Sequence, residues 1–205
     1  MRNMMMQRWL DFVGDRTTVE RALWLYRMIE GFYNQSYRSY HNLDHIRRML
    51  DDMEEYFPRA SELEILAIWF HDLVYIPGNS ENETQSTWQM TVLMRGIFAY
   101  DELVTATSHI LATAYGKKQT MPFSSSSKRV RDIDLLSLAA ERADYQINTA
   151  RIREEHNLPD SVWKAGRRHF IEQMLAQKRI FLTEELHAWF EYRARSNLQY
   201  ELTKY

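Results

Sequence analysis

The chain has 205 residues, 45% of them hydrophobic and 26% charged, and its 26 basic and 28 acidic side chains give a formal net charge of −2. These values are typical of a folded globular protein and exclude wholesale disorder. Because the sequence contains no cysteine, it excludes disulfides, thiolate catalysis and cysteine-ligated metal sites. The near-neutral charge gives no reason to expect a nucleic-acid polymer or a membrane surface as a partner.

The hydrophobic segments are short. None approaches the roughly 20 apolar residues that a membrane-spanning helix needs. Gln7 and Arg8 stand where a signal peptide would have its apolar core. We therefore expect a cytoplasmic protein that does not enter a membrane, and the sequence does not indicate its oligomeric state.

Apolar residues recur at helical spacing along most of the chain, and glycine and proline are sparse. Asn42 and Ser61 are suited to cap helices, and Glu64 completes a capping box with Ser61. The pattern predicts a loop over 116–128 and helices, in chain order, over 42–55, 62–70, 83–97, 101–115, 133–139, 142–156, 161–178 and 186–202. We predict a single all-α domain over 1–205, a compact bundle of about seven to ten helices. Its core motifs lie within 38–134, and C-terminal helices over 141–203 pack on them.

The predicted helix 62–70 is apolar on nearly every side, which is typical of a helix in the middle of a bundle. It is followed directly by His71 and Asp72, so we expect both side chains to be at least partly buried. A buried carboxylate needs compensation. Asp72 could cap or pair with a neighbouring helix while His71 is an ordinary core histidine, or both could bind a metal ion, whose charge compensates the carboxylate.

Two further segments favour the metal interpretation. Histidines occur in the segment 40–45, at the start of a predicted helix, and acids occur at Asp132 and Asp134. Histidine and carboxylate contributed by three separate helices form the mixed nitrogen and oxygen sphere that suits Mn²⁺, Fe²⁺, Co²⁺, Zn²⁺ or Mg²⁺.

The order of these motifs resembles the HD-domain superfamily of metal-dependent phosphohydrolases, and in particular a branch of small bacterial proteins described as predicted HD-type phosphohydrolases. The resemblance covers roughly residues 37–202. It is carried by five motifs in the same order: Tyr40-His41-Asn42-x-x-His45, Trp69-Phe70-His71-Asp72-x-Val74-Tyr75, Asn82-Glu83-x-x-Ser86, Asp132-x-Asp134-Leu135, and a C-terminal set of Ile152-Arg153-x-Glu155, Gly166-Arg167 and Glu191-x-x-Ala194-Arg195-x-Asn197-Leu198.

The resemblance implies an HD-like fold and one bound divalent ion. The candidate metals are Mn²⁺, Co²⁺, Ni²⁺, Fe²⁺, Zn²⁺ and Mg²⁺. The ligands that it implies are His45, His71, Asp72 and Asp134. Asp132 is the alternative to Asp134, and the pattern favours Asp134 because it precedes Leu135.

The same resemblance implies a hydrolytic reaction on a small phosphate ester or a nucleotide, in which the ion activates a water molecule. We expect Asp72 and Glu83 to be catalytic, with Glu83 as the general base, although an acid at the start of a helix is equally explained by the helix dipole. Arg38, His41 and Asn82 are the expected substrate contacts; Arg38 could instead be merely solvated.

The chain departs from the branch at one position. Other members tend to have a histidine shortly after the segment corresponding to Ile110-x-x-Thr113, and Gly116 stands at about that place here. This difference puts a second metal ion in question. It also supports the alternative hypothesis, a non-catalytic ligand-binding or scaffolding protein of the same fold with a structural or vestigial metal site.

Overall fold

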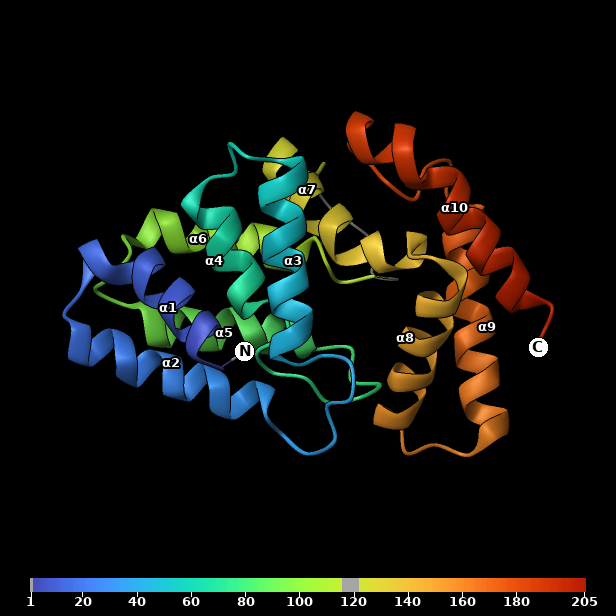
Figure 1. Cartoon of the computed structure of the whole chain (residues 1–205), viewed down its shortest axis with the longest axis horizontal. Helices are drawn as coiled ribbons and strands as arrows, with labels where there is room; N and C mark the ends of the chain where they lie inside the picture. Colours follow the sequence, from blue (N-terminus) through green and yellow to red (C-terminus); the bar gives the residue numbers. More distant parts are fainter. Residues whose placement is uncertain (1, 116–121) are drawn as a thin grey trace.

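The computed structural model describes residues 2–115 and 122–205, and over these ranges the chain is entirely helical (Figure 1). No β-strand occurs in the part described, which confirms the predicted all-α class. The α-helices are α1 (Arg2–Val13), α2 (Val19–Tyr33), α3 (Leu43–Tyr56), α4 (Glu62–Phe70), α5 (Asn82–Met94), α6 (Tyr100–Leu111), α7 (Ser125–Leu135), α8 (Arg142–Glu155), α9 (Asp160–Ala176) and α10 (Glu184–Leu202), with 3₁₀-helices η1 (Gly14–Arg16) and η2 (Leu136–Ala139).

Helix α4 forms the centre of the N-terminal part, as its apolar sequence predicts. The capping box is present: the side chain of Ser61 accepts from the Glu64 amide, and Glu64 accepts from the Ser61 amide at 2.8 Å. Trp69 and Phe70 at its other end are fully buried. The helix packs against α3, α6 and α7, so the residues that follow Phe70 emerge inside the molecule rather than at its surface.

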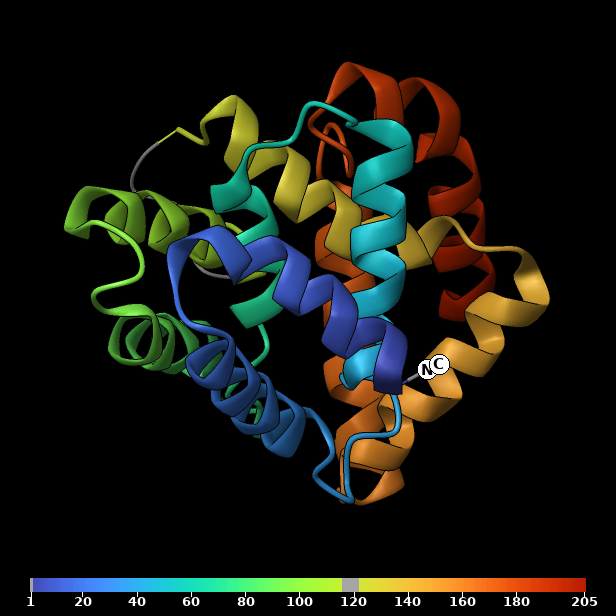
Figure 2. The same cartoon turned by 60° about the vertical axis from the view of Figure 1, so that its left-hand side comes forward.

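Helices α1 and α2 are not among the helices predicted from the sequence. They cover α4 from one side (Figure 2). The Trp9 ring meets Trp69 edge-on at 5.3 Å between centroids, and the Tyr33 hydroxyl donates to the Trp69 carbonyl at 3.0 Å. A local signal for α2 exists, because the Thr18 side chain caps it and buried residues follow at helical spacing.

The predicted loop 116–128 and helix 133–139 are corrected by the structure. Helix α7 begins at Ser125, where the Ser124 hydroxyl accepts from the Ser127 amide at 3.0 Å. Serine is a favourable helix N-cap, so the serine run starts a helix instead of extending the loop. Asp132 and Asp134 consequently lie in the last turns of α7. Residues 116–121, and with them Gly116, lie outside the described part.

The predicted end of α5 is also corrected. The helix stops at Met94 instead of continuing to residue 97, because Gly96 adopts a positive φ of 77° that breaks the helical path. The other predicted helices agree with the structure to within a few residues. Within the described ranges, no helix is both long enough and apolar enough to cross a membrane.

The C-terminal helices α8, α9 and α10 form a second group beside α7 and η2, as Figures 1 and 2 show. Their buried charges form ion pairs. Arg195 pairs with Glu191 at 2.7 Å, and Arg167 pairs with Glu201 at 2.9 Å. Glu155 lies toward the N-terminal part, where it contacts His41.

Candidate metal centre

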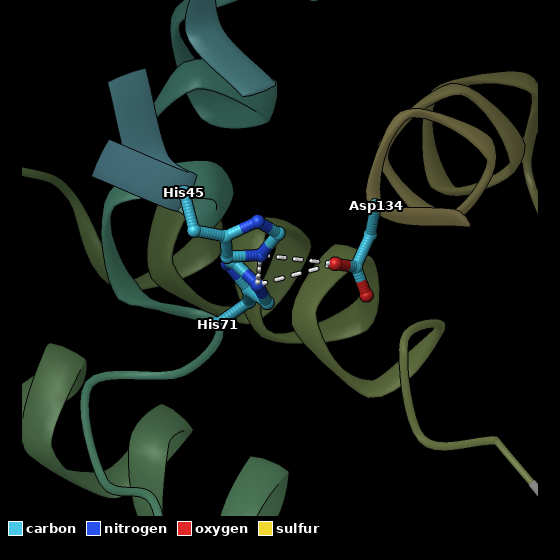
Figure 3. A group of neighbouring side chains, drawn as sticks. All are labelled: His45, His71 and Asp134. Atoms are coloured by element: carbon cyan, nitrogen blue, oxygen red, sulfur yellow. Dashed lines mark hydrogen bonds and ion pairs between the residues drawn. The ribbon is translucent and has the colours of Figure 1, made fainter. Parts of the chain in front are cut away.

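Three helix ends converge on one point. His45 lies in the first turn of α3, whose Asn42 cap accepts from the Asp44 amide at 2.9 Å. His71 immediately follows α4, and Asp134 comes from the last turn of α7. Figure 3 shows the two imidazoles side by side with the carboxylate facing them. Each helix is fixed by its own cap and core, so the side chains are held before any ligand binds.

The donor atoms are spaced as metal ligands. His45 Nε2 lies 3.3 Å from His71 Nε2 and 3.2 Å from Asp134 Oδ1, and His71 Nε2 lies 3.6 Å from Asp134 Oδ1. Ligands about 2.0–2.2 Å from one ion lie roughly 3.0–3.5 Å from each other in tetrahedral or octahedral geometry. His45, His71 and Asp134 could therefore hold one metal ion.

Asp72 borders this group without being one of its three members. Its Oδ2 lies 3.1 Å from His71 Nε2 and 3.9 Å from His45 Nε2. The predicted fourth ligand is thus adjacent to both imidazoles. Within the described ranges of the chain, the ion-pair partners of Asp72 are these two histidines, one of them on the neighbouring helix α3.

Hydrogen bonds orient two of the three ligands. His71 Nδ1 lies 3.0 Å from the Ile68 carbonyl, which places the proton on Nδ1 and leaves the lone pair of Nε2 facing the group. The Tyr115 hydroxyl donates to Asp134 Oδ2 at 2.8 Å, so the other carboxylate oxygen is the one turned toward the imidazoles. Sequence reasoning missed Tyr115, because its partner is 19 residues away on another helix.

Among the described residues, the partly buried carboxylates of Asp72 and Asp134 form ion pairs with His45 and His71 and with no arginine or lysine. Burial alone would raise the pKa of the Asp134 carboxyl and lower that of the His71 imidazole. At His71 the carboxylates of Asp72 and Asp134 outweigh burial and hold the pKa of the imidazole well above its ordinary value. At Asp134 the imidazoles of His71 and His45 outweigh burial and hold the pKa of the carboxyl well below its ordinary value. For His45, burial dominates and the pKa is lowered. A divalent cation would replace the proton that these carboxylates hold on His71.

Asp132, the alternative ligand, faces away from the group. One of its oxygens accepts from the amides of Leu182 and Thr183 at 2.6 and 2.7 Å and from the Thr183 hydroxyl at 2.9 Å, and the other lies 3.1 Å from Arg131. Its carboxylate therefore fixes the segment before α10. Of the two acids, Asp134 is the one that belongs to the group that could hold a metal ion.

His41 lies beside the group and is held by Glu155. His41 Nδ1 is 2.5 Å from one Glu155 oxygen, while the other oxygen accepts from the amides of Tyr40 and His41. Its ring stacks on Tyr75 at 4.2 Å. Burial would lower the pKa of His41, but the carboxylates of Asp72 and Glu155 outweigh burial and raise it. The predicted substrate contact thus presents an oriented imidazole next to the metal ligands.

The Asn82-Glu83-x-x-Ser86 motif ties α5 to the loop that follows Asp72. The Asn82 side chain accepts a hydrogen bond from the Ile76 amide and donates one to the Ile76 carbonyl, both at 2.9 Å. The Ser86 hydroxyl likewise accepts from the Val74 amide and donates to the Val74 carbonyl. Asn82 is buried and both polar atoms of its side chain bind Ile76, which argues against its predicted contact with substrate. Glu83 is half-buried and lines a cleft that also reaches Asp134.

Arg38 is also engaged in the fold. Its buried guanidinium donates to the carbonyls of His41, Asp72 and Leu73 and to the Gln35 side chain. These bonds clamp the segment before α3 to the segment after α4. They argue against the predicted phosphate contact, and they explain why an arginine occurs three residues before His41.

Two clefts meet at Asp134. The arginine cleft, about 430 Å³, reaches His45 and is lined by the arginines of α3, α8 and α10, namely Arg48, Arg151 and Arg193. The tyrosine cleft, about 310 Å³, reaches His41 and Glu83 and contains Tyr75, Tyr115 and Tyr145. The metal group is therefore accessible to a small molecule from cleft surfaces next to its ligands.

In comparisons with known proteins, no family model, no curated protein and no solved structure matches this chain. The functional argument consequently depends on the site itself and on the motifs in the sequence.

Proposed function

We propose that this chain is a metal-dependent phosphohydrolase related to the HD-domain superfamily, acting on a small phosphate ester or a nucleotide. The observation that carries the proposal is the convergence of His45, His71 and Asp134 from three helices at ligand spacing, with Asp72 adjacent. These are the residues that the HD motif pattern implies, and their convergence in space is independent of that pattern.

A divalent ion in this group supplies Lewis-acid polarisation of a phosphoryl oxygen and acidifies a water molecule. The residues of the chain provide the rest. The buried imidazoles of His45 and His71 bind through Nε2, and Asp134 and Asp72 balance the charge of the ion. Glu83, which faces the tyrosine cleft with Asp134, accepts the proton from the attacking water. His41 donates a hydrogen bond to the phosphate from the position in which Glu155 holds it.

The test is metal content together with turnover. Protein purified without chelator is analysed by inductively coupled plasma mass spectrometry, and hydrolysis of p-nitrophenyl phosphate is measured with Mn²⁺, Co²⁺, Ni²⁺, Fe²⁺, Zn²⁺ or Mg²⁺. We expect close to one ion per chain and metal-dependent release of p-nitrophenol, both lost in His71→Ala. Metal-free protein that gains no activity with any of the six ions contradicts the proposal.

A second candidate function is a non-catalytic metal-binding module. It is favoured by one observation: Arg38 and Asn82, two expected substrate contacts, are buried and hydrogen-bonded to the backbone of the loop after α4. The two candidates differ in Glu83→Gln. A hydrolase retains its metal and loses turnover in this variant, whereas a structural metal site retains its metal and has no turnover in either protein.

A further inference from the structure

The arginine and tyrosine clefts are separate but share a wall. Tyr40, Asp134, Ser137 and Asn148 line both. From that wall the arginine cleft extends along the later turns of α3 toward α10, and the tyrosine cleft extends toward the loop after α4 and toward α9. A phosphate held at Asp134 therefore has open volume on two sides.

Two clefts beside one phosphate site can accommodate two organic substituents of the phosphorus. A phosphomonoester has one organic group and fills one cleft. A phosphodiester has two, one for each cleft. We propose that the substrate is a phosphodiester that binds with its phosphate at the metal group and one organic substituent in each cleft. This inference deepens the proposed function and rests on it.

The two clefts differ in chemistry, so the two substituents differ as well. In the arginine cleft, Arg48 and Arg193 are bound by Asp44 and Glu141. Among the described residues, Arg151 has no hydrogen-bond or ion-pair partner, and its guanidinium is available to a hydroxyl-bearing substituent. The carboxylates of Asp52 and Asp144 line the same cleft and can accept hydrogen bonds from such hydroxyl groups. The opposite cleft presents tyrosine rings, which suit a flat, less polar substituent.

The reaction is a simple hydrolysis. The oxygen of water forms a bond to phosphorus, the bond from phosphorus to one ester oxygen breaks, and that oxygen leaves with a proton. The products are a phosphomonoester and an alcohol. Water is the co-reactant, and no oxidant or reductant is consumed.

Helix α8 offers matched positions for a test. Ile147 lines only the arginine cleft, and Thr149 lines only the tyrosine cleft. Neither side chain is buried, and neither belongs to the metal group. Ile147→Trp and Thr149→Trp each place a bulky ring in one cleft. Ala150→Trp is the control, since Ala150 is exposed on the same helix and lines neither cleft.

The experiment compares bis(p-nitrophenyl) phosphate with p-nitrophenyl phosphate on metal-loaded protein. We expect kcat/KM to be about tenfold or more higher for the diester. Ile147→Trp and Thr149→Trp should each lower kcat/KM for the diester about tenfold. At most one of these two substitutions should lower kcat/KM for the monoester to that extent. Ala150→Trp should leave kcat/KM unchanged for both esters. Metal content and thermal stability, measured in all variants, should match the unmodified protein.

Two results would overturn the inference while leaving the proposed function intact. One is a preference for the monoester. The other is a diester rate that only one of the two cleft substitutions lowers. Turnover of neither ester by protein that holds its metal is a different result, because it contradicts the proposed hydrolase function itself.

Discussion

Two carboxylates in different regions of this molecule, the buried Glu201 and the partly buried Asp134, are compensated differently. In the C-terminal helices, Glu201 is 2% exposed and accepts from Arg167 at 2.9 and 3.0 Å and from Tyr205 at 2.8 Å. At the junction of α3, α4 and α7, Asp134 instead faces His45 and His71.

The partner of each carboxylate, an arginine or a histidine, decides whether the carboxylate can also bind a cation. An arginine is always charged and satisfies a carboxylate permanently, so the Glu201 pair stabilises the fold and has no capacity to bind a cation. A histidine is charged only when protonated, and a neutral imidazole is itself a metal ligand. In the part of the chain that the structure describes, the carboxylates of Asp72 and Asp134 pair only with histidines, so a bound cation could take the place of a histidine proton.

The largest expected effect is on the structural side. Arg167→Met removes the permanent cation from Glu201 and leaves a buried carboxylate, which costs about 3–5 kcal/mol of unfolding free energy. Urea denaturation measures it. The neighbouring Arg168→Met is the control, because its partner Glu172 is exposed and the loss should stay below about 0.5 kcal/mol. Equal losses in both variants would contradict the distinction.

The next effect distinguishes the two acids of α7. Asp134→Asn should weaken Co²⁺ binding by about 100-fold or more, since a ligand and its charge are lost. Asp132→Asn should leave Co²⁺ affinity unchanged but lower stability by about 1–3 kcal/mol, because Leu182 and Thr183 lose a charged acceptor. Calorimetric titration and thermal denaturation of both variants provide the readouts. Loss of Co²⁺ binding in the Asp132 variant alone would reverse the assignment.

A smaller effect is expected for the residue that orients Asp134. Tyr115→Phe removes the hydroxyl that binds Oδ2 and should weaken Co²⁺ binding about tenfold, as is typical of groups that support metal ligands. Tyr192 is 88% exposed, and Tyr192→Phe should change nothing. Unaltered affinity in the Tyr115 variant would show that packing alone holds the carboxylate in place.

The smallest effect is pH-dependent and belongs to the pair of His41 and Glu155. The pKa of Glu155 is lowered by its bonds to His41 in spite of burial, so its contribution is present above pH 4.5 and is lost as pH falls through the folded-state value. The pKa of His41 is raised, so its contribution is present below pH 6.5 and is lost as pH rises through its folded-state value. Both contributions are complete between these limits.

Glu155→Gln should therefore destabilise the metal-free protein by about 1 kcal/mol, with the largest loss between pH 4.5 and 6.5. Chemical denaturation at pH 4, 5.5 and 8 measures the difference between the variant and the parent. A difference that does not vary with pH would mean that Glu155 acts only as an acceptor for the backbone amides of Tyr40 and His41.

Much of the fold follows from local signals in the sequence. The cap at Ser61 and the apolar run after it place His71 at the end of a buried helix, and Asn42 places His45 in a first turn. Those signals depend on neighbours within a few residues. By contrast, the start of α7 was predicted too late, because a serine run is compatible both with a loop and with a helix cap.

The rest of the site depends on contacts that the sequence does not encode locally. Asp132 and Asp134 are two residues apart, which places them on opposite sides of a helix. Only the packing of α7 decides which one meets α3. The contact of Tyr115 with Asp134 and that of Glu155 with His41 could not be predicted for the same reason, since the partners lie 19 and 114 residues away.

The way in which Asn82 and Ser86 hold the loop after Asp72 has a consequence for protein engineering. Both residues bind the backbone of that loop and none of its side chains. Ile76, which is 51% exposed, can therefore be varied, with the exception of proline, without loosening the support beneath it. Libraries at this position would alter a third cleft, which Ile76 lines with Tyr37, Glu155 and His156, while the anchoring amide and hydroxyl stay constant.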